Sequence, residues 1–130
     1  MLENLISFAL YFVSASGLML LFGALYIRIT PYPELELIRS GNLAAALALL
    51  GALAGFALAL ASVITHSLST RDMLVWGLIA MLVQLAVYLL VRWLLPDLAA
   101  GIARDCRAHG AFLGGSALCA GILNAACMVW

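Results

Sequence analysis

The residues best suited to chemistry are the few polar side chains that interrupt long apolar runs. They are Ser14, Ser16, Gln84, Tyr88 and Asn124. Gln84 and Tyr88 are four residues apart and Arg92 follows after four more, so these three are expected on one stripe of a helix. Polar groups in such runs either form hydrogen bonds to a neighbouring helix or line a path for a solute. For Gln84 and Asn124 we favour the hydrogen bond between helices, and the path is the alternative.

Patterns for catalysis or metal binding are weak in the rest of the chain. Cys106 and His109 are three residues apart, but a zinc site needs four ligands, and His66 is expected at the opposite membrane face. The sequence has neither a Ser, His and Asp arrangement for nucleophilic catalysis nor a glycine-rich phosphate loop. We therefore predict a protein that is not an enzyme and that binds no cofactor and no metal.

The composition indicates a membrane protein. Hydrophobic residues make up 67% of the 130 residues and charged residues only 9%, whereas soluble domains contain roughly 25% charged residues. Mean hydropathy is +1.18. Six arginines balance six acidic residues, and no run of like charge indicates a nucleic-acid partner. The lipid bilayer is therefore the first partner expected.

Four segments are long and apolar enough to cross a bilayer, which requires about 20 mostly apolar residues. They run approximately from Leu5 to Ile27, Leu43 to Ile64, Met73 to Leu95 and Gly110 to Trp130. In hydrocarbon the backbone must satisfy its own hydrogen bonds, and uninterrupted runs of this length do so as helices. The predicted fold class is an all-α integral membrane protein, with four transmembrane helices in a single domain over residues 1–130.

The arginines indicate an orientation, because positive charge is retained on the cytoplasmic side of a membrane. Five of the six flank the first and third connections, namely Arg28, Arg39, Arg92, Arg104 and Arg107. Only Arg71 lies in the second connection. We therefore expect those five residues at the cytoplasmic interface and both chain termini on the outer side, with Trp130 at the outer interface.

A shift of 64 residues aligns the chain with itself. It brings Arg28 onto Arg92 and Gly51 onto Gly115. This period predicts two copies of one unit, each made of a helix, a cytoplasmic connection and a second helix. The copies would cover residues 5–64 and 73–130. Because each copy holds two spans, both would have the same orientation, as in membrane proteins built from parallel repeats.

Each cytoplasmic connection contains a proline followed by an acidic residue. The two pairs are Pro33-Glu34 and Pro96-Asp97. Proline and a carboxylate both suit the first turn of a helix, so a short helix is expected in each connection. Its apolar side would lie on the bilayer interface, with Leu35 and Ile38 in the first connection and Leu98, Ile102 and Cys106 in the second. A plain solvated connection is the alternative.

Glycine and alanine recur at helical spacing in the second and fourth predicted helices. Such stripes let helix backbones approach closely in lipid, where packing drives association. The candidate packing residues are Gly51, Gly55, Gly110, Gly114, Gly121 and Ala125. They predict tight helix contacts within the bundle or between subunits, and we expect a homo-oligomer.

Three stretches carry a family resemblance: ITPYPELELIRSGNLAA, WGLIAMLVQL and the terminal GILNAACMVW. They resemble the YjfL-like bacterial inner-membrane proteins, an uncharacterised family of two-repeat, four-helix proteins. The resemblance covers essentially the whole chain and departs from Cys106 to His109, where an Asn-Thr-Ala-Ala-like helix start is expected. It implies a multi-pass protein of the bacterial inner membrane with periplasmic termini. Genes of the family often lie beside those of membrane-stress and polyamine-related proteins, which implies a role in the envelope.

These features predict a non-enzymatic inner-membrane protein that acts as an oligomerising scaffold or partner subunit in envelope homeostasis. Its partner would be a protein in the membrane or at the cytoplasmic face. The alternative is a small oligomeric channel or transporter with a polar path past Gln84 and Asn124. A dry, leucine-filled centre favours the first hypothesis, and a water-sized opening past Gln84 favours the second.

Overall fold

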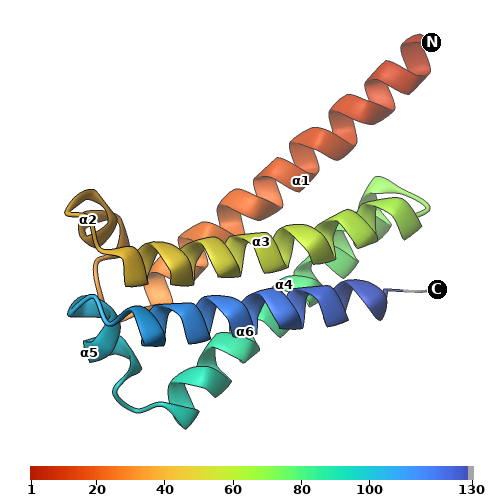
Figure 1. Cartoon of the computed structure of the whole chain (residues 1–130). Coiled ribbons are helices and arrows are strands. Elements are labelled where there is room, and N and C mark those ends of the chain that lie inside the picture. The colour runs from red at the N-terminus through yellow and green to blue at the C-terminus, as the bar shows by residue number, and fades with distance from the viewer. Residues whose placement is uncertain (129–130) are drawn as a thin grey trace.

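The computed structural model describes residues 1–128, which contain helices and no strand. In chain order the helices are α1 (Leu2–Ile29), α2 (Glu34–Arg39), α3 (Leu43–His66), α4 (Thr70–Leu94), α5 (Leu98–Ala103) and α6 (Arg107–Ala126) (Figure 1). Within the described residues, α1, α3 and α4 are long and apolar enough to cross a membrane. The all-helical membrane class is confirmed. The interfacial position predicted for Trp130 lies outside the described residues.

The fourth predicted span corresponds to α6, which is not among those three apolar helices. The 20 residues of α6 include four glycines and the polar residues His109 and Asn124, which lower its hydropathy. α6 runs parallel to α3 and beside it (Figure 1), in the most extensive helix contact of the described chain. Of these residues, Gly110, Gly114 and Gly121 pack against α3, whereas Asn124 bonds to α4 and His109 lies beside Gly101 of α5.

Glycines set the distance between α3 and α6. A Cβ at Gly51 would overlap the backbone of Gly114, and a Cβ at Gly121 would overlap the backbone of Gly55. Gly110 faces the backbone of the first turn of α3 in the same way. Only residues without a side chain allow backbones to come this close. The two helices brought together belong to one chain.

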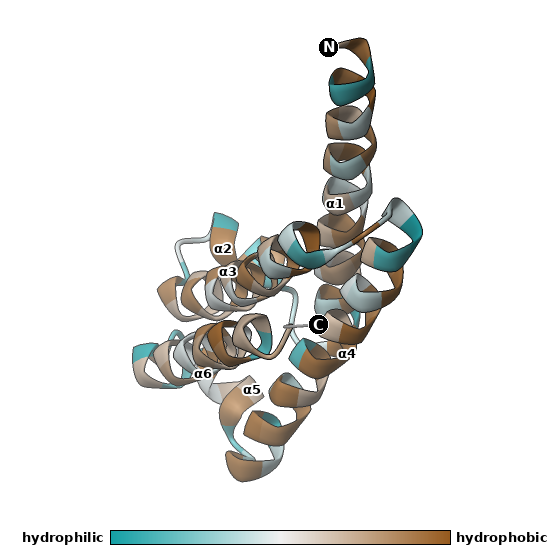
Figure 2. Cartoon of the chain, turned by 90° about the vertical axis from the view of Figure 1, so that its right-hand side faces the viewer, coloured by the Kyte–Doolittle hydropathy of each residue, from teal (hydrophilic) through white to brown (hydrophobic). Residues whose placement is uncertain are grey.

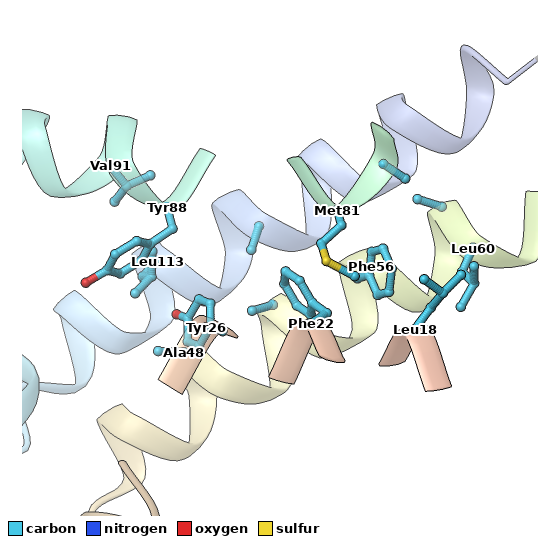
Figure 3. Close-up of a cluster of buried hydrophobic side chains, with 14 of the residues drawn as sticks. Leu18, Phe22, Tyr26, Ala48, Phe56, Leu60, Met81, Tyr88, Val91 and Leu113 are labelled. Atoms are coloured by element: carbon cyan, nitrogen blue, oxygen red, sulfur yellow. The ribbon is translucent and has the colours of Figure 1, made fainter. Parts of the chain in front are cut away.

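Aromatic side chains join α1 to the other helices (Figure 3). Phe22 stacks on Phe56 of α3 with ring centroids 4.7 Å apart, and Met81 of α4 lies beside them. Within α1 only Leu18, Phe22 and Tyr26 are buried. The first ten residues of the chain are exposed, and the first half of α1 projects away from the other helices (Figure 1).

The short helices α2 and α5 lie at the same end of the molecule (Figure 1). The prediction of a short helix in each connection is confirmed. The prediction that the apolar side of α5 lies on the bilayer was wrong, because α5 packs against α6 and α3 and buries Leu98 and Ile102 there. The connection turns back onto the bundle, so its apolar side contacts protein.

Hydrophilic residues gather near the ends of the long helices and in the connections (Figure 2). The end that carries α2 and α5 also carries five exposed arginines: Arg28, Arg39, Arg92, Arg104 and Arg107. Arg71 lies in the first turn of α4, at the opposite end. The uneven distribution of arginines along the sequence thus becomes a difference between the two ends of the bundle. We refer to the end that carries α2 and α5 as the arginine-rich end.

Candidate functional site

Gln84 and Asn124 lie where α4 contacts α6. Gln84 Nε2 donates a hydrogen bond to the Ala117 carbonyl at 3.2 Å, and Asn124 Nδ2 donates to the Ala80 carbonyl at 3.3 Å. Both side chains are buried. The structure therefore brings these two predicted polar residues to one helix contact, each bonded to the backbone of the facing helix.

The other predicted polar residues lie elsewhere. Ser14 and Ser16 are half-buried on α1, and no hydrogen bond within residues 1–128 joins them to the two amides. Tyr88 is buried on α4, and its ring meets the ring of Tyr26 edge-on with centroids 5.3 Å apart (Figure 3). Tyr88 therefore belongs to a second polar group, nearer the arginine-rich end.

This second group, which we call the tyrosine–carboxyl cluster, combines side chains from four segments. Its members are Tyr26 of α1, Tyr32 of the 30–33 connection, Glu34 of α2 and Tyr88 of α4. Electrostatic interactions link Glu34 with all three phenols. The three hydroxyls and both carboxyl oxygens are buried, and none forms a hydrogen bond of normal geometry within residues 1–128. Such a gathering of buried, unpaired polar groups indicates a functional site.

The local sequence directs Glu34 into this cluster. Thr30 follows the end of α1, and its hydroxyl donates to the Ile27 carbonyl at 3.0 Å. Pro31 and Pro33 then restrict the backbone of the connection, and Pro33 is the N-cap of α2. Glu34 is the first residue of α2 and is only 1% exposed. The rigid connection thus turns the first side chain of α2 toward α1 and α4.

Burial raises the pKa of the two cluster members that lie outside the long helices, Glu34 and Tyr32. It raises the pKa of Glu34 from 4.5 to about 7, and the nearby Thr30 hydroxyl offsets part of that rise. Burial also raises the pKa of Tyr32, and the negative charge of an ionised Glu34 adds to this rise. Both effects favour neutral side chains. The cluster can therefore exchange a proton at Glu34 near neutral pH.

Other chemistry has little support at this end of the molecule. In the part of the chain that the structure describes, no group of three or more His, Cys, Asp and Glu side chains could hold a metal ion. Arg92 acts electrostatically on the phenols of Tyr32 and Tyr88 but is itself exposed. Proton exchange and hydrogen bonding are the chemistry available to the cluster.

The sequence did not predict this cluster. The Pro33-Glu34 pair predicted a helical first turn where a carboxylate meets the helix dipole, whereas the Glu34 carboxyl is buried against aromatic rings. The missed signal was the rigid Pro31-Tyr32-Pro33 connection, which joins a tyrosine-bearing helix end to an acidic residue.

The turns that precede α3 and α6 are hydrogen-bonded to each other at the arginine-rich end. Asn42 caps α3 by accepting from the Ala45 N–H at 2.8 Å, and its Nδ2 donates to the Ile102 carbonyl of α5, also at 2.8 Å. In return, Asp105 accepts from the Ala44 N–H at 2.9 Å. Each turn thus supplies a side chain to the other half of the chain. In contrast, Cys106, the N-cap of α6, makes no capping hydrogen bond.

We expect Asn42→Ala to lower the free energy of unfolding by about 2 kcal/mol, because it removes a helix cap and leaves a buried carbonyl without its donor. Equilibrium unfolding in detergent micelles, followed by circular dichroism, measures this loss. Ser40→Ala is the matched control, because Ser40 is exposed and bonds only within its own turn, to the Leu37 carbonyl. An equal loss in both variants would contradict the bridging role of Asn42.

The fold and these sites define a helical membrane protein whose polar groups are enclosed by its own helices. The chain belongs to the family described as Domain of Unknown Function (DUF350), whose profile matches residues 1–128. It is 40% identical over 129 residues to the UPF0719 inner membrane protein YjfL of Escherichia coli strain K12, covering 99% of this chain and 98% of that protein. The YjfL protein of Escherichia coli O157:H7 shows the same identity and coverage. The resemblance to YjfL-like proteins is confirmed. No solved structure matches the chain.

Proposed function

We propose that this protein is a non-enzymatic scaffold or partner subunit of the bacterial inner membrane that works in envelope homeostasis. The observation that carries the proposal is the bonding of Gln84 and Asn124 to backbone carbonyls of facing helices. A polar path requires side chains that face water, whereas these amides face protein. The inner-membrane location rests on the YjfL relatives, and the envelope role rests on the family resemblance.

In this proposal the chain is built from two parallel copies of a two-helix unit. The element bounds support it, because α2 and α5 begin 64 residues apart, at residues 34 and 98, as do α3 and α6, at residues 43 and 107. Gly41 and Asp105, also 64 residues apart, both have positive φ, at 91° and 61°. Each precedes the N-cap of a long helix. The same turn thus recurs at the predicted period.

The proposal also includes four membrane crossings, with α6 as the fourth. The length of the contact between α6 and α3 supports this crossing. The contact begins where Gly110 lies beside Ala44 and ends at a 2.7 Å hydrogen bond from Ser62 Oγ to the Ala125 carbonyl. A helix that stays beside α3 over this length passes through the same depth of membrane. The arginine-rich end would face the cytoplasm and both termini the periplasm.

The proposal includes a homo-oligomer. Its subunits would have to meet through surfaces other than the glycine-bearing sides of α3 and α6, which face each other. Those glycines contact the neighbouring helix of the same chain, and all but the half-buried Gly51 are buried there: Gly51, Gly55, Gly110, Gly114 and Gly121. The first half of α1 remains exposed, with large apolar side chains between Leu2 and Val13. This surface is available to lipid or to a partner.

The role of Gln84 tests the proposal. We expect reconstituted liposomes that contain the unmodified chain to show no ion flux above empty liposomes, because the amide is buried and its Nε2 donates to the Ala117 carbonyl. In a bacterium that lacks the gene, Gln84→Leu should restore envelope function as well as the unmodified gene does, because a scaffold needs the fold and not a polar path. Flux assays and complementation measure the two expectations.

Val83→Leu is the matched control for Gln84→Leu, because Val83 is its exposed neighbour on α4. It shows whether added side-chain bulk on this helix disturbs insertion. Ion flux in the unmodified chain that disappears in Gln84→Leu and persists in Val83→Leu would overturn the scaffold proposal. That result would support a channel or transporter.

A further inference from the structure

The most buried side chain of the short helix α2 ends in a carboxyl group. Of its six residues Glu34 is the only fully buried one, whereas Leu35 is 55% exposed. Leu37 and Ile38 are half-buried. A surface helix is normally anchored by a stripe of apolar side chains. Here an ionisable group occupies the most buried position, so the attachment of α2 depends on the charge of that group.

The side chains beside Glu34 carry no charge: Tyr26 of α1, Thr30 and Tyr32 of the connection, and Tyr88 of α4. Arg92 of α4 is a cation that acts electrostatically on Tyr32 and Tyr88 from an exposed position. α3, against which α2 packs, has no titratable side chain before His66 at its far end. Glu36 and Arg39 of α2 itself are exposed. Within residues 1–128 no arginine forms a hydrogen bond with the Glu34 carboxyl.

These surroundings suit a carboxylic acid better than a carboxylate. A buried carboxylate that accepts no hydrogen bond is strongly disfavoured, and neither oxygen of Glu34 accepts one within residues 1–128. The Thr30 hydroxyl favours the ionised carboxyl, but it donates to the Ile27 carbonyl at 3.0 Å, and burial outweighs its effect on the pKa of Glu34. The phenol oxygens can accept a hydrogen bond from a protonated carboxyl. The site therefore matches the neutral form of Glu34.

We propose that Glu34 binds a proton in the closed bundle and that loss of this proton releases α2 from the tyrosine–carboxyl cluster. α2 is then a flap at the arginine-rich end, docked when Glu34 is neutral and undocked when it is ionised. The released proton passes to water, and no other bond is made or broken. This flap does not depend on whether the chain is a scaffold or a transporter.

The direction of the pH dependence follows from the two states of the carboxyl. Its pKa is about 7 when docked and 4.5 when exposed, so the docked state binds the proton more tightly. Docking is strongest below pH 4.5, weakens as the pH rises from 4.5 to about 7, and is constant above that. This interval corresponds to a roughly 300-fold fall in the docking equilibrium constant.

Carbon-13 NMR of the full chain, labelled at the glutamate carboxyl carbons, tests the proton site directly. The chain has only three glutamates, Glu3, Glu34 and Glu36. We expect one carboxyl signal to titrate near pH 7, to persist in Glu36→Gln and to be absent from Glu34→Gln. Glu36 is the matched control because it is an exposed acid on the same short helix. If every carboxyl signal of the unmodified chain titrates only in the acid range, the proposal is overturned, whether or not Glu34→Gln folds.

A nitroxide label on Leu35→Cys, in a chain whose three cysteines are changed to serine, tests the flap. Between about pH 4.5 and about pH 7 the label should become more mobile, and above that its mobility should stay constant. The same rise is expected in Glu36→Gln and no rise in Glu34→Gln. Constant mobility in the parent chain, or a rise retained in Glu34→Gln, would overturn the proposal. So would mobility that follows exchange of sodium for tetramethylammonium at fixed pH, because the cluster would then bind a metal cation.

Discussion

Gly121→Ala is expected to lower the free energy of unfolding by about 3 kcal/mol, although it adds a single methyl group. The added Cβ would overlap the backbone of Gly55, and a backbone cannot turn aside as a flexible side chain can. α3 and α6 must therefore move apart. Their separation also weakens the nearby hydrogen bond from Ser62 to the Ala125 carbonyl. Equilibrium unfolding in detergent micelles, followed by circular dichroism, measures the loss.

Gly115→Ala is the matched control on the same helix. A Cβ at Gly115 meets no atom within 4 Å, and alanine favours a helix over glycine by roughly 0.8 to 1 kcal/mol in soluble hosts. We therefore expect Gly115→Ala to leave the free energy of unfolding unchanged or to raise it slightly. Equal losses in the two variants would show that glycine acts through backbone flexibility, and the close-contact explanation would be wrong.

The sequence predicted which faces of α3 and α6 approach a neighbour but could not predict the neighbour. The spacing of Gly51 and Gly55, and of Gly114 and Gly121, defines one small-residue face on each helix. The spacing of glycines on one helix does not indicate whether the facing helix belongs to the same chain or to another subunit. Only the arrangement of all the helices places the two faces against each other within one chain.

The short helices show a different limit. Local chemistry predicted them from proline and an acidic residue, because these residues favour a first helical turn wherever it lies. The inward direction of Glu34 depends on Tyr88, which is 54 residues away in the sequence. Likewise, Leu98 and Ile102 were predicted to face the bilayer. The same spacing of apolar residues occurs on a helix side that faces lipid and on one that faces protein, so the sequence could not distinguish the two. Local sequence thus identified the elements, and long-range contacts decided their orientation.

For the polar residues in the predicted spans, too, the sequence predicted position along the helix but not the direction of the side chain. By helical rise, the sequence positions of Ser14, Ser16, Gln84 and Asn124 place all four within about one helical turn in depth, which predicts that they could meet. Depth does not specify direction around a helix axis. Gln84 and Asn124 face the α4–α6 contact, whereas the two serines lie on α1, which contacts α3 and α4. Equal depth was therefore insufficient to predict a single cluster.

Phe22→Ala is expected to weaken the attachment of α1 and to lower the free energy of unfolding by about 3 kcal/mol. The Phe22 ring is fully buried and stacks on Phe56, and α1 has only two other buried residues, Leu18 and Tyr26. Removing the ring leaves a cavity at the centre of this small contact. In lipid, packing of this kind holds helices together because lipid tails are as apolar as the side chains. Equilibrium unfolding in detergent micelles measures the loss of stability.

The detachment itself can be measured by cross-linking α1 to α4. The Leu18 side chain lies over Gly77, where a Cβ would contact it, so cysteines introduced by Leu18→Cys and Gly77→Cys should be joined by a short bifunctional thiol reagent. We expect Phe22→Ala to reduce this cross-link. Phe12→Ala makes the same change about three turns earlier on α1, where the ring is 61% exposed, and should leave both the cross-link and the stability unchanged. If the two variants behave alike, the buried aromatic contact is not what holds α1 to the bundle.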